Sequence, residues 1–193
     1  MEKIELNVEA FGHLSDDEFF NFCQSNELLR IERDAQRRII IMAPTGSFSG
    51  NRNATLSAEF VIWNRTHHKG YVFDSSAGFV LPNGAVRSPD VSFMLKERWQ
   101  ALSRAEQEQF APLCPDFVLE LRSKNDRLSD LQAKMEEYVA NGARFGWLID
   151  PYEQQVYVYE AGKEVEVFVD FGQPLRGRHF MQDFEIVLSD ILA

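Results

Sequence analysis

Two carboxylates stand in apolar segments of the sequence, where a charged side chain is costly. Glu120 lies inside the apolar run 117–121, and Asp90 opens the apolar run 91–94. An unpaired buried carboxylate is strongly unfavourable, so proteins bury one where an ion pair or a metal neutralises it. A pair of carboxylates, completed by water and phosphate oxygens, is a usual binding site for Mg²⁺. Asp90 and Glu120 therefore predict a site for Mg²⁺ or Mn²⁺ on neighbouring strands.

Each carboxylate also has a purely structural explanation. Glu120 shares a strand face with Arg122, because side chains alternate along a strand, and an ion pair with Arg122 or with a lysine would merely stabilise the fold. Asp90 follows Pro89 and could be an ordinary residue between a turn and a strand. Taken one at a time, these residues leave both explanations open.

A lysine supplies a third group for the chemistry. On the helix predicted over 126–141, one stripe of residues contains Lys134 together with Leu131, Met135 and Tyr138, by the spacing i, i+3, i+4 and i+7. This places an ammonium beside the apolar stripe that faces the sheet, where it could orient an attacking water or stabilise a phosphate transition state. The alternative is a lysine whose aliphatic part is buried and whose ammonium is in water.

The elements that must position these residues alternate between strands and helices. Ser15 and Glu18 form a capping-box pattern at the start of a helix. β-branched and aromatic runs predict the strands, and Gly and Pro end the elements. We expect helices over 16–29, 51–67, 96–110 and 126–141, a loop over 45–50, and strands over 38–42, 71–74, 79–81, 91–94, 115–121, 145–150, 155–159 and 165–170, with an amphipathic segment 184–192 that docks on them. The order predicts an α/β fold with a central mixed sheet flanked by helices.

Composition limits the class of protein. The length of 193 residues and a hydrophobic content of 45% fit one globular domain. The two cysteines, Cys23 and Cys114, are far apart and fit reduced thiols in the cytoplasm. No apolar run is long enough to cross a membrane, and the first residues lack the pattern of a secretory signal.

The charge at first argues against a nucleic-acid partner. Twenty basic residues against 30 acidic ones leave a net charge of −10, so the protein lacks a global positive field. Basic residues nevertheless gather near the predicted site, at Arg122, Lys124, Arg127 and Lys134, where contacts with a phosphate backbone would carry affinity without sequence information. A bound divalent cation would also invert the local sign of the charge.

Four segments follow one another along the chain: Ser88–Val91, Pro115–Ser123, Asp130–Tyr138 and Asn141–Pro151. In this order they resemble the Uma-two family of restriction endonucleases, within the PD-(D/E)XK nuclease superfamily, and the segment Ile39–Gly46 fits the first strand and loop of that family. The resemblance covers residues 31–190. It implies a restriction-endonuclease-like fold, which here is a single domain over 1–193 with an N-terminal helical extension, 1–30, and a core over 31–190.

The resemblance also implies roles for individual residues. Asp90 and Glu120 match the metal ligands, Lys134 matches a catalytic lysine that has moved to the following helix, and Tyr138 matches an aromatic position one turn further on. Arg122 stands where the superfamily pattern has lysine; it stays protonated and so can contact phosphate but cannot act as a general base. Glu59, on the first core helix, is a weaker match to an accessory acidic residue and is otherwise an ordinary helix-surface glutamate.

Three functions follow as hypotheses. The first is a metal-dependent endonuclease that hydrolyses DNA phosphodiester bonds, with Mg²⁺ or Mn²⁺ as cofactor. The second is a nuclease fold with a decayed site that binds nucleic acid or protein. The third is a structural ion-pair cluster of Glu120, Arg122 and Lys134. By analogy with the superfamily we also expect a homodimer.

Overall fold

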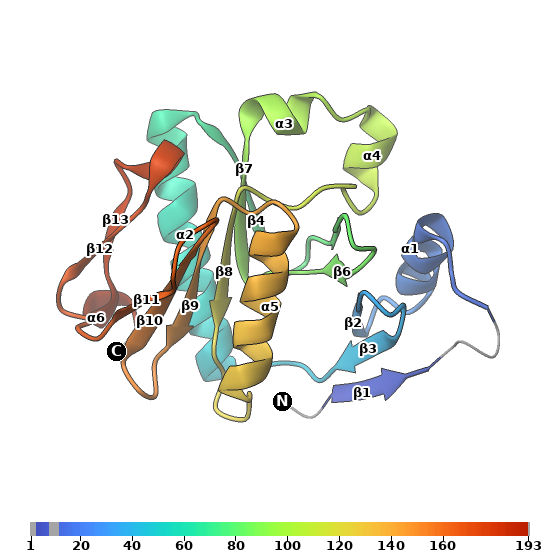
Figure 1. The fold of residues 1–193 in the computed structure, drawn as a ribbon, viewed down its shortest axis with the longest axis horizontal. Helices are drawn as coiled ribbons and strands as arrows, with labels where there is room; N and C mark the ends of the chain where they lie inside the picture. Colours follow the sequence, from blue (N-terminus) through green and yellow to red (C-terminus); the bar gives the residue numbers. More distant parts are fainter. Residues whose placement is uncertain (1–2, 8–11, 193) are drawn as a thin grey trace.

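The protein, described here from a computed structural model over residues 3–7 and 12–192, is built around a mixed sheet (Figure 1). Residues 1–2, 8–11 and 193 of the predicted domain lie outside the described residues. Within the described part this sheet has six strands in the order β11-β10-β9-β8-β7-β4, of which β8 and β9 are parallel. The strands are β4 (Gly70–Asp74), β7 (Val91–Leu95), β8 (Phe117–Leu121), β9 (Phe145–Asp150), β10 (Gln155–Glu160) and β11 (Glu166–Phe168).

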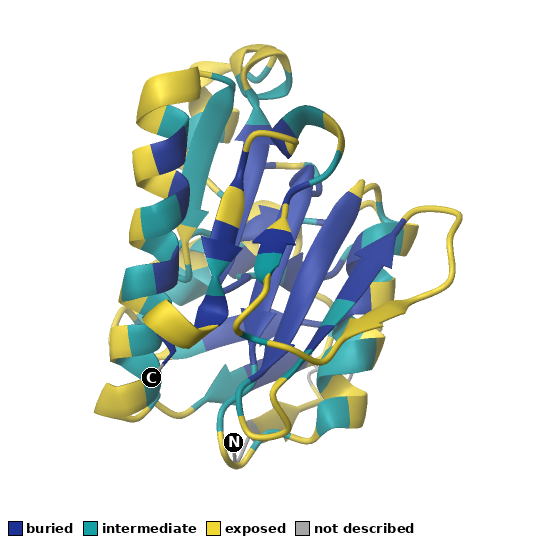
Figure 2. Ribbon diagram, turned by 90° about the vertical axis from the view of Figure 1, so that its left-hand side faces the viewer, coloured by how far each residue is buried: buried dark blue, intermediate teal, exposed yellow. Residues whose placement is uncertain are grey.

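Two helices cover opposite faces of this sheet. Helix α2 (Ser47–His67) packs Phe60 into one core cluster with Leu119, whereas helix α5 (Leu128–Ala140) packs Met135 into another cluster with Val118. Neighbouring residues of β8 therefore face different helices, as the alternation of a strand requires. Figure 2 shows the buried strands between helices whose outward sides are exposed. The predicted α/β fold, with a central mixed sheet flanked by helices, is confirmed.

A second sheet lies beside the first and contains much of the N-terminal part of the chain. Its strand order is β1-β3-β2-β6-β5, and helix α1 (Asp16–Ser25) packs Phe19 against Ile31 and Ile39 of this sheet. The predicted capping box of α1 is present, with Ser15 and Glu18 bonded to each other's backbone N–H. The strands are β1 (Lys3–Leu6), β2 (Arg30–Arg33), β3 (Ile39–Met42), β5 (Phe79–Val80) and β6 (Val86–Arg87).

The C-terminal segment packs against the α2 side of the central sheet. Phe184 stacks on Phe60 of α2 with ring centroids 4.3 Å apart, and Leu188 joins the same core cluster. The predicted docking of residues 184–192 is therefore confirmed. The elements of residues 184–192 are β13 (Glu185–Val187) and α6 (Leu188–Ile191), and they are preceded by β12 (Pro174–Arg176) and the 3₁₀ helix η2 (His179–Met181).

The structure corrects several predicted boundaries. The single helix expected over 96–110 is two helices, α3 (Lys96–Gln100) and α4 (Arg104–Glu108), because Ser103 forms a capping box with Glu106 that starts a new helix. Residues 47–50 of the expected loop are the first turn of α2. The first helix ends at residue 25 rather than 29, and the strands β1 and β2 were not predicted.

Two observations bear on the environment of the protein. Both cysteines are free thiols; Cys114 is buried and Cys23 is partly exposed. None of the helices in the described ranges has the length and apolar character needed to cross a membrane.

Candidate active site

Strands β7 and β8 bring Asp90 and Glu120 to adjacent positions. The antiparallel register pairs Val91 with Leu119, so Asp90, just before β7, adjoins Glu120 near the end of β8. Both side chains are buried, with exposed fractions of 7% for Asp90 and 4% for Glu120. Two strands with residues 96–116 between them thus bring together the two carboxylates predicted to share a metal.

Asp90 is oriented by hydrogen bonds to both of its oxygens. Its Oδ2 accepts from the backbone N–H of Leu121 at 2.9 Å, and its Oδ1 accepts from Nδ2 of Asn53, on α2, at 3.0 Å. Nη2 of Arg30, on β2, lies 3.6 Å from Oδ1. The carboxylate is therefore anchored to β8, α2 and β2 at once.

Glu120 receives two donors from helix α5. Nζ of Lys134 lies 2.9 Å from Oε1 of Glu120, and the hydroxyl of Tyr138 donates to the same oxygen at 3.0 Å. Burial raises the pKa of Glu120 to about 7, and the negative charges of Asp90 and Glu32 add to this effect, while Lys134 opposes it. A cation close to this carboxyl would stabilise its ionised form and so lower its pKa.

Lys134 bridges Glu120 to a second buried carboxylate. Its Nζ donates to Oε1 of Glu32, on β2, at 3.0 Å. Although burial acts in the opposite direction, the charges of Lys134 and Arg87 and a hydrogen bond from the N–H of Ser88 hold the pKa of Glu32 at about 2. Burial lowers the pKa of Lys134, but the two carboxylates outweigh it and raise that pKa above its ordinary value. The bridge is therefore an ammonium between two acidic groups.

Arg122, another of the predicted basic residues, pairs with a different carboxylate. Nη1 of Arg122 is 2.6 Å from Oδ2 of the fully buried Asp150, and its Nε donates to the carbonyl of Asp126 at 3.2 Å. Of the two ion pairs in the structural explanation, the one with Arg122 is wrong, because Arg122 pairs with Asp150. The other, with a lysine, is present between Glu120 and Lys134. Lys124 and Arg127 follow in an exposed loop.

Helix α2 contributes a different residue from the one expected. Glu59 lies partly exposed on this helix, and it is Asn53, six residues earlier, that bonds to Asp90. Six residues are 600° of helical rotation at about 100° each, so Glu59 points away from the direction of Asn53. Tyr138, by contrast, is buried and bonds directly to Glu120.

Sequence reasoning missed Arg30, Glu32, Asn53 and Arg87. The available signal was the pattern of β2, Arg30-Ile31-Glu32-Arg33, in which charged residues flank an apolar one in a strand of four. Because this strand lies in the second sheet, its pattern does not reveal that it adjoins the α5 helix.

The two carboxylates suit a divalent cation that keeps other ligands. Among residues 3–7 and 12–192 no group of three or more His, Cys, Asp or Glu side chains is arranged to hold a metal ion. Mg²⁺ binds through one or two carboxylates and fills its remaining positions with water and substrate phosphate. Asp90 and Glu120 fit this requirement, because burial and then the negative charge of Asp90 raise the pKa of Glu120, and a cation between the two carboxylates would offset both effects.

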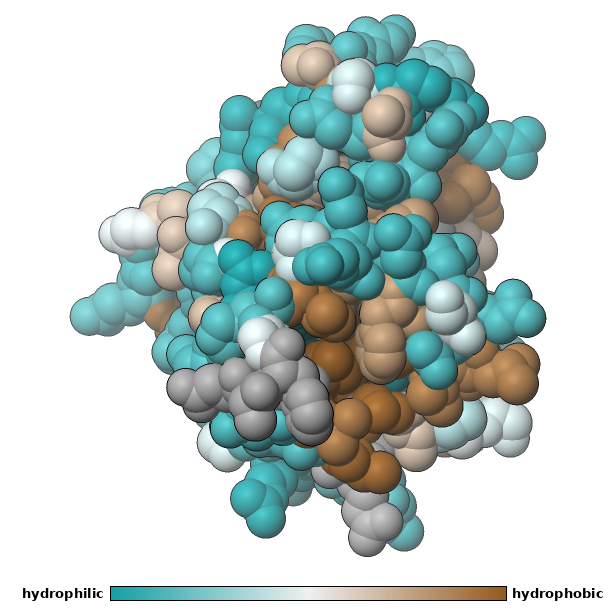
Figure 3. Space-filling view, turned by 90° about the vertical axis from the view of Figure 1, so that its right-hand side faces the viewer, coloured by the Kyte–Doolittle hydropathy of each residue, from teal (hydrophilic) through white to brown (hydrophobic). Residues whose placement is uncertain are grey.

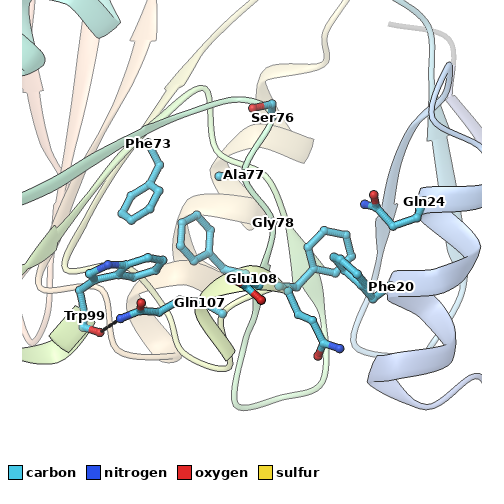
Figure 4. A pocket seen from close by; sticks show the side chains of 13 residues that line it. Phe20, Gln24, Phe73, Ser76, Ala77, Gly78, Trp99, Gln107 and Glu108 are labelled. Atoms are coloured by element: carbon cyan, nitrogen blue, oxygen red, sulfur yellow. Dashed lines mark hydrogen bonds between the residues drawn. The ribbon is translucent and has the colours of Figure 1, made fainter. Parts of the chain in front are cut away.

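A cavity of about 280 Å³ lies away from these residues (Figure 4). Aromatic rings from α1, β4 and α3 line it, with Gln107 donating to the carbonyl of Trp99 at 2.8 Å. The lining contains neither carboxylate of the pair nor Lys134. The aromatic members of the lining are Phe20, Phe73, Phe79, Trp99 and Phe110.

Comparison with known proteins decides the family. A family model described as "Uma2: Putative restriction endonuclease" matches residues 16–189, which is most of the chain. The chain belongs to the Uma2 family. The resemblance to this family in the sequence is thereby confirmed, and the candidate site lies inside the matched range.

A solved structure supports the fold of this Uma2 protein. It is described as a putative nuclease belonging to DUF820 from Anabaena variabilis, and it is 19% identical in sequence. The match covers 93% of this chain and 97% of that chain, with a TM-score of 0.75. No curated protein matches the chain.

Proposed function

We propose that this Uma2 protein is a Mg²⁺- or Mn²⁺-dependent endonuclease that hydrolyses DNA phosphodiester bonds. The observation that carries the proposal is the adjacency of Asp90 and Glu120 with the ammonium of Lys134, 2.9 Å from Glu120. The membership of the chain in a family of restriction-endonuclease-like proteins supports the same reaction.

Each group has a separate task in this proposal. Asp90 and Glu120 hold the cation, which when bound polarises the phosphate and makes a nucleophilic water available near neutral pH. Asn53 and the N–H of Leu121 keep Asp90 oriented before substrate arrives, so that little reorganisation is needed during the reaction. Lys134 orients the attacking water or stabilises the negative charge that develops on the phosphate.

Basic groups around the site complete the proposed DNA contacts. The side chain of Arg30 is 27% exposed and its guanidinium adjoins Asp90, so it can contact a phosphate oxygen at the site. Arg122, Lys124 and Arg127 follow β8 and contact the backbone of the DNA in this proposal, although Arg122 also holds Asp150. Contacts of this kind give affinity that depends on salt.

The test is cleavage by purified protein of linear, supercoiled, branched and single-stranded DNA with Mg²⁺ or Mn²⁺. We expect cleavage that Asp90→Ala and Glu120→Ala each abolish while circular dichroism shows a folded protein. Binding without cleavage by wild-type protein would favour the alternative of a nuclease fold that only binds nucleic acid or protein. Equal cleavage by the wild type and both variants would assign the activity to a contaminant.

The proposal includes a homodimer and a cytoplasmic location. Apolar side chains gather on the face formed by α1 and the strands next to it (Figure 3), and this part of the chain exposes Ile4, Leu6, Leu28 and Leu29. Contiguous exposed apolar surface is typical of interaction sites. The two free thiols fit a reducing compartment. Sedimentation equilibrium measures whether the protein is a dimer.

A further inference from the structure

Glu32 lies at the end of a chain of ion pairs that starts at the proposed active site. Lys134 contacts Glu120 at 2.9 Å on one side and Glu32 at 3.0 Å on the other. Glu32 belongs to β2 of the second sheet, and 102 positions separate it from Lys134 in the sequence. The contact therefore joins the second sheet to helix α5 at the group proposed to act on the phosphate.

Both oxygens of Glu32 are already used by donors of the protein. Oε1 accepts from the N–H of Ser88 at 3.0 Å and from Lys134, and Oε2 is 3.1 Å from Nη1 of Arg87. The side chain is 2% exposed. The Glu32 carboxylate is thus held by three donors of the protein and shielded from solvent, and the donor that links it to the carboxylate pair is Lys134.

Lys134 needs such a partner if its ammonium is to stay in one place. A lysine side chain has four methylene groups and loses much of its rotamer freedom when it is fixed. Glu120 alone gives Nζ of Lys134 one contact, whereas Glu120 and Glu32 together hold it between two carboxylates. The third N–H of the ammonium then has a defined direction.

The attachment of α5 to the second sheet does not depend on this contact alone. Arg87 of β6 binds Glu137 of α5 at 2.6 Å, and the side chain of Asn83 donates to Glu137 at 3.0 Å. These bonds lie one helical turn from Lys134 and hold the same two parts of the molecule together. Helix α5 is therefore joined to the second sheet by other bonds besides the contact between Glu32 and Lys134.

We infer that Glu32 is a positioning residue for the cleavage reaction: it holds the ammonium of Lys134 in place between two strands of different sheets. The inference rests on the proposed endonuclease function and adds to it a residue from outside the central sheet. Asp90 and Glu120 supply the metal site, and β2 supplies the support for the lysine.

The experiment compares Glu32→Gln with Glu137→Gln, which cuts a neighbouring bond of the same network without touching Lys134. Single-turnover cleavage at saturating DNA and Mn²⁺ gives the rate constant, and titrations give the apparent affinities for DNA and Mn²⁺. We expect Glu32→Gln to lower the rate constant by about 10- to 100-fold, the range typical of residues that orient an active group. Both affinities should stay within about twofold of wild type, and Glu137→Gln should keep the wild-type rate constant.

A second variant and a spectroscopic measurement keep the test independent of folding and of activity. Glu32→Asp retains the charge but shortens the side chain, so its rate constant should fall below that of the wild type by less than the about 10- to 100-fold expected for Glu32→Gln. This comparison with the wild type stands even if Glu32→Gln fails to fold. The ¹⁵N resonance of the Lys134 ammonium, assigned with Lys134→Arg, should shift in Glu32→Asp and Glu32→Gln and stay unchanged in Glu137→Gln.

Two results would overturn the inference, and they differ from failure of the proposed function. An active wild type with an equally active, folded Glu32→Gln would show that Glu32 does not position Lys134 for cleavage. An unshifted Lys134 resonance in both Glu32 variants would show that the contact does not hold the ammonium. Absence of cleavage by the wild type on every DNA would instead overturn the endonuclease itself, and with it any catalytic role of Glu32.

Discussion

The carboxylate of Asp90 accepts a hydrogen bond from the backbone N–H of Leu121, with Oδ2 and N 2.9 Å apart. Leu121 directly follows Glu120, so one carboxylate of the proposed metal site is bonded to the strand that carries the other. The bond uses backbone geometry, which is stiffer than a contact between two side chains. The spacing of the carboxylates is thereby set by the fold before any cation binds.

The first prediction concerns this bond. Asp90→Ala removes the acceptor and leaves the N–H of Leu121 buried, so we expect it to lower the free energy of unfolding by about 1–3 kcal/mol. Asp90→Asn keeps an oxygen that can accept the bond and should cost less, although it also abolishes cleavage. Urea denaturation measures both; an Asp90→Ala protein as stable as Asp90→Asn would contradict the role of the bond.

The second prediction is a pH dependence of stability that originates at Glu120. Its pKa is about 7 in the folded protein and has the ordinary value of 4.5 in the unfolded chain, so between these values the folded protein binds more protons. The contribution of Glu120 to stability is therefore full below pH 4.5 and is lost as the pH rises through 7. The difference in unfolding free energy between wild type and Glu120→Gln should fall over this range, and a flat difference would contradict it.

Glu32 should show the opposite dependence. Its pKa is about 2 in the folded protein, below the ordinary 4.5, so its contribution is present above pH 4.5 and is lost as the pH falls toward 2. Denaturation of Glu32→Gln along the same acid series measures this. Because Glu32→Gln has no carboxyl at this position, its unfolding free energy should fall less than that of the wild type between pH 4.5 and pH 2.

The third prediction concerns the metal. A cation that binds the folded protein raises its stability by mass action, and ionised Glu120 binds it better than protonated Glu120. Mn²⁺ should therefore raise the melting temperature more at a pH above 7 than at a pH below 4.5. A chelator should reverse the rise, and Asp90→Asn should lack it. Equal shifts in wild type and Asp90→Asn would place the cation elsewhere.

The fourth prediction separates catalysis from structural ion pairing. Lys134→Met leaves Glu32 and Glu120 as buried carboxylates without their shared ammonium, which we expect to cost about 3–5 kcal/mol. Adding Glu32→Gln and Glu120→Gln removes the charges and should restore most of that stability. The triple variant should remain inactive. A stable triple variant that still cleaves DNA would reduce the cluster to its structural role.

The fifth prediction distinguishes basic residues that lie close together in sequence. Arg122→Ala leaves the fully buried Asp150 without its guanidinium, so it should lower the unfolding free energy by about 1–3 kcal/mol or more. Lys124→Ala and Arg127→Ala change exposed side chains and should stay within about 0.5 kcal/mol of wild type. Each of these two should instead lower the salt dependence of DNA binding by about one unit of slope. Fluorescence anisotropy at several salt concentrations measures it.

Local patterns predicted the elements with a clear period. The stripe of Lys134, Met135 and Tyr138 on one side of α5 and the alternation of β8 both follow from the geometry of single elements. The prediction of one helix over 96–110 was wrong, because it followed the charge and helix propensity of the whole segment and overlooked the second capping box at Ser103. A start signal inside a helical pattern outweighed the pattern.

The sequence by itself determined that an aspartate, a glutamate and a lysine occur at positions where burial is costly, in an order that fits the Uma2 family. It could not determine that Lys134 bridges Glu120 to Glu32, or that Asn53 orients Asp90. Glu32 and Lys134 lie on elements with no shared period or turn, and only the packing of the second sheet beside α5 brings them within 3.0 Å. Long-range contacts of this kind arise from how whole elements pack, which no local spacing encodes.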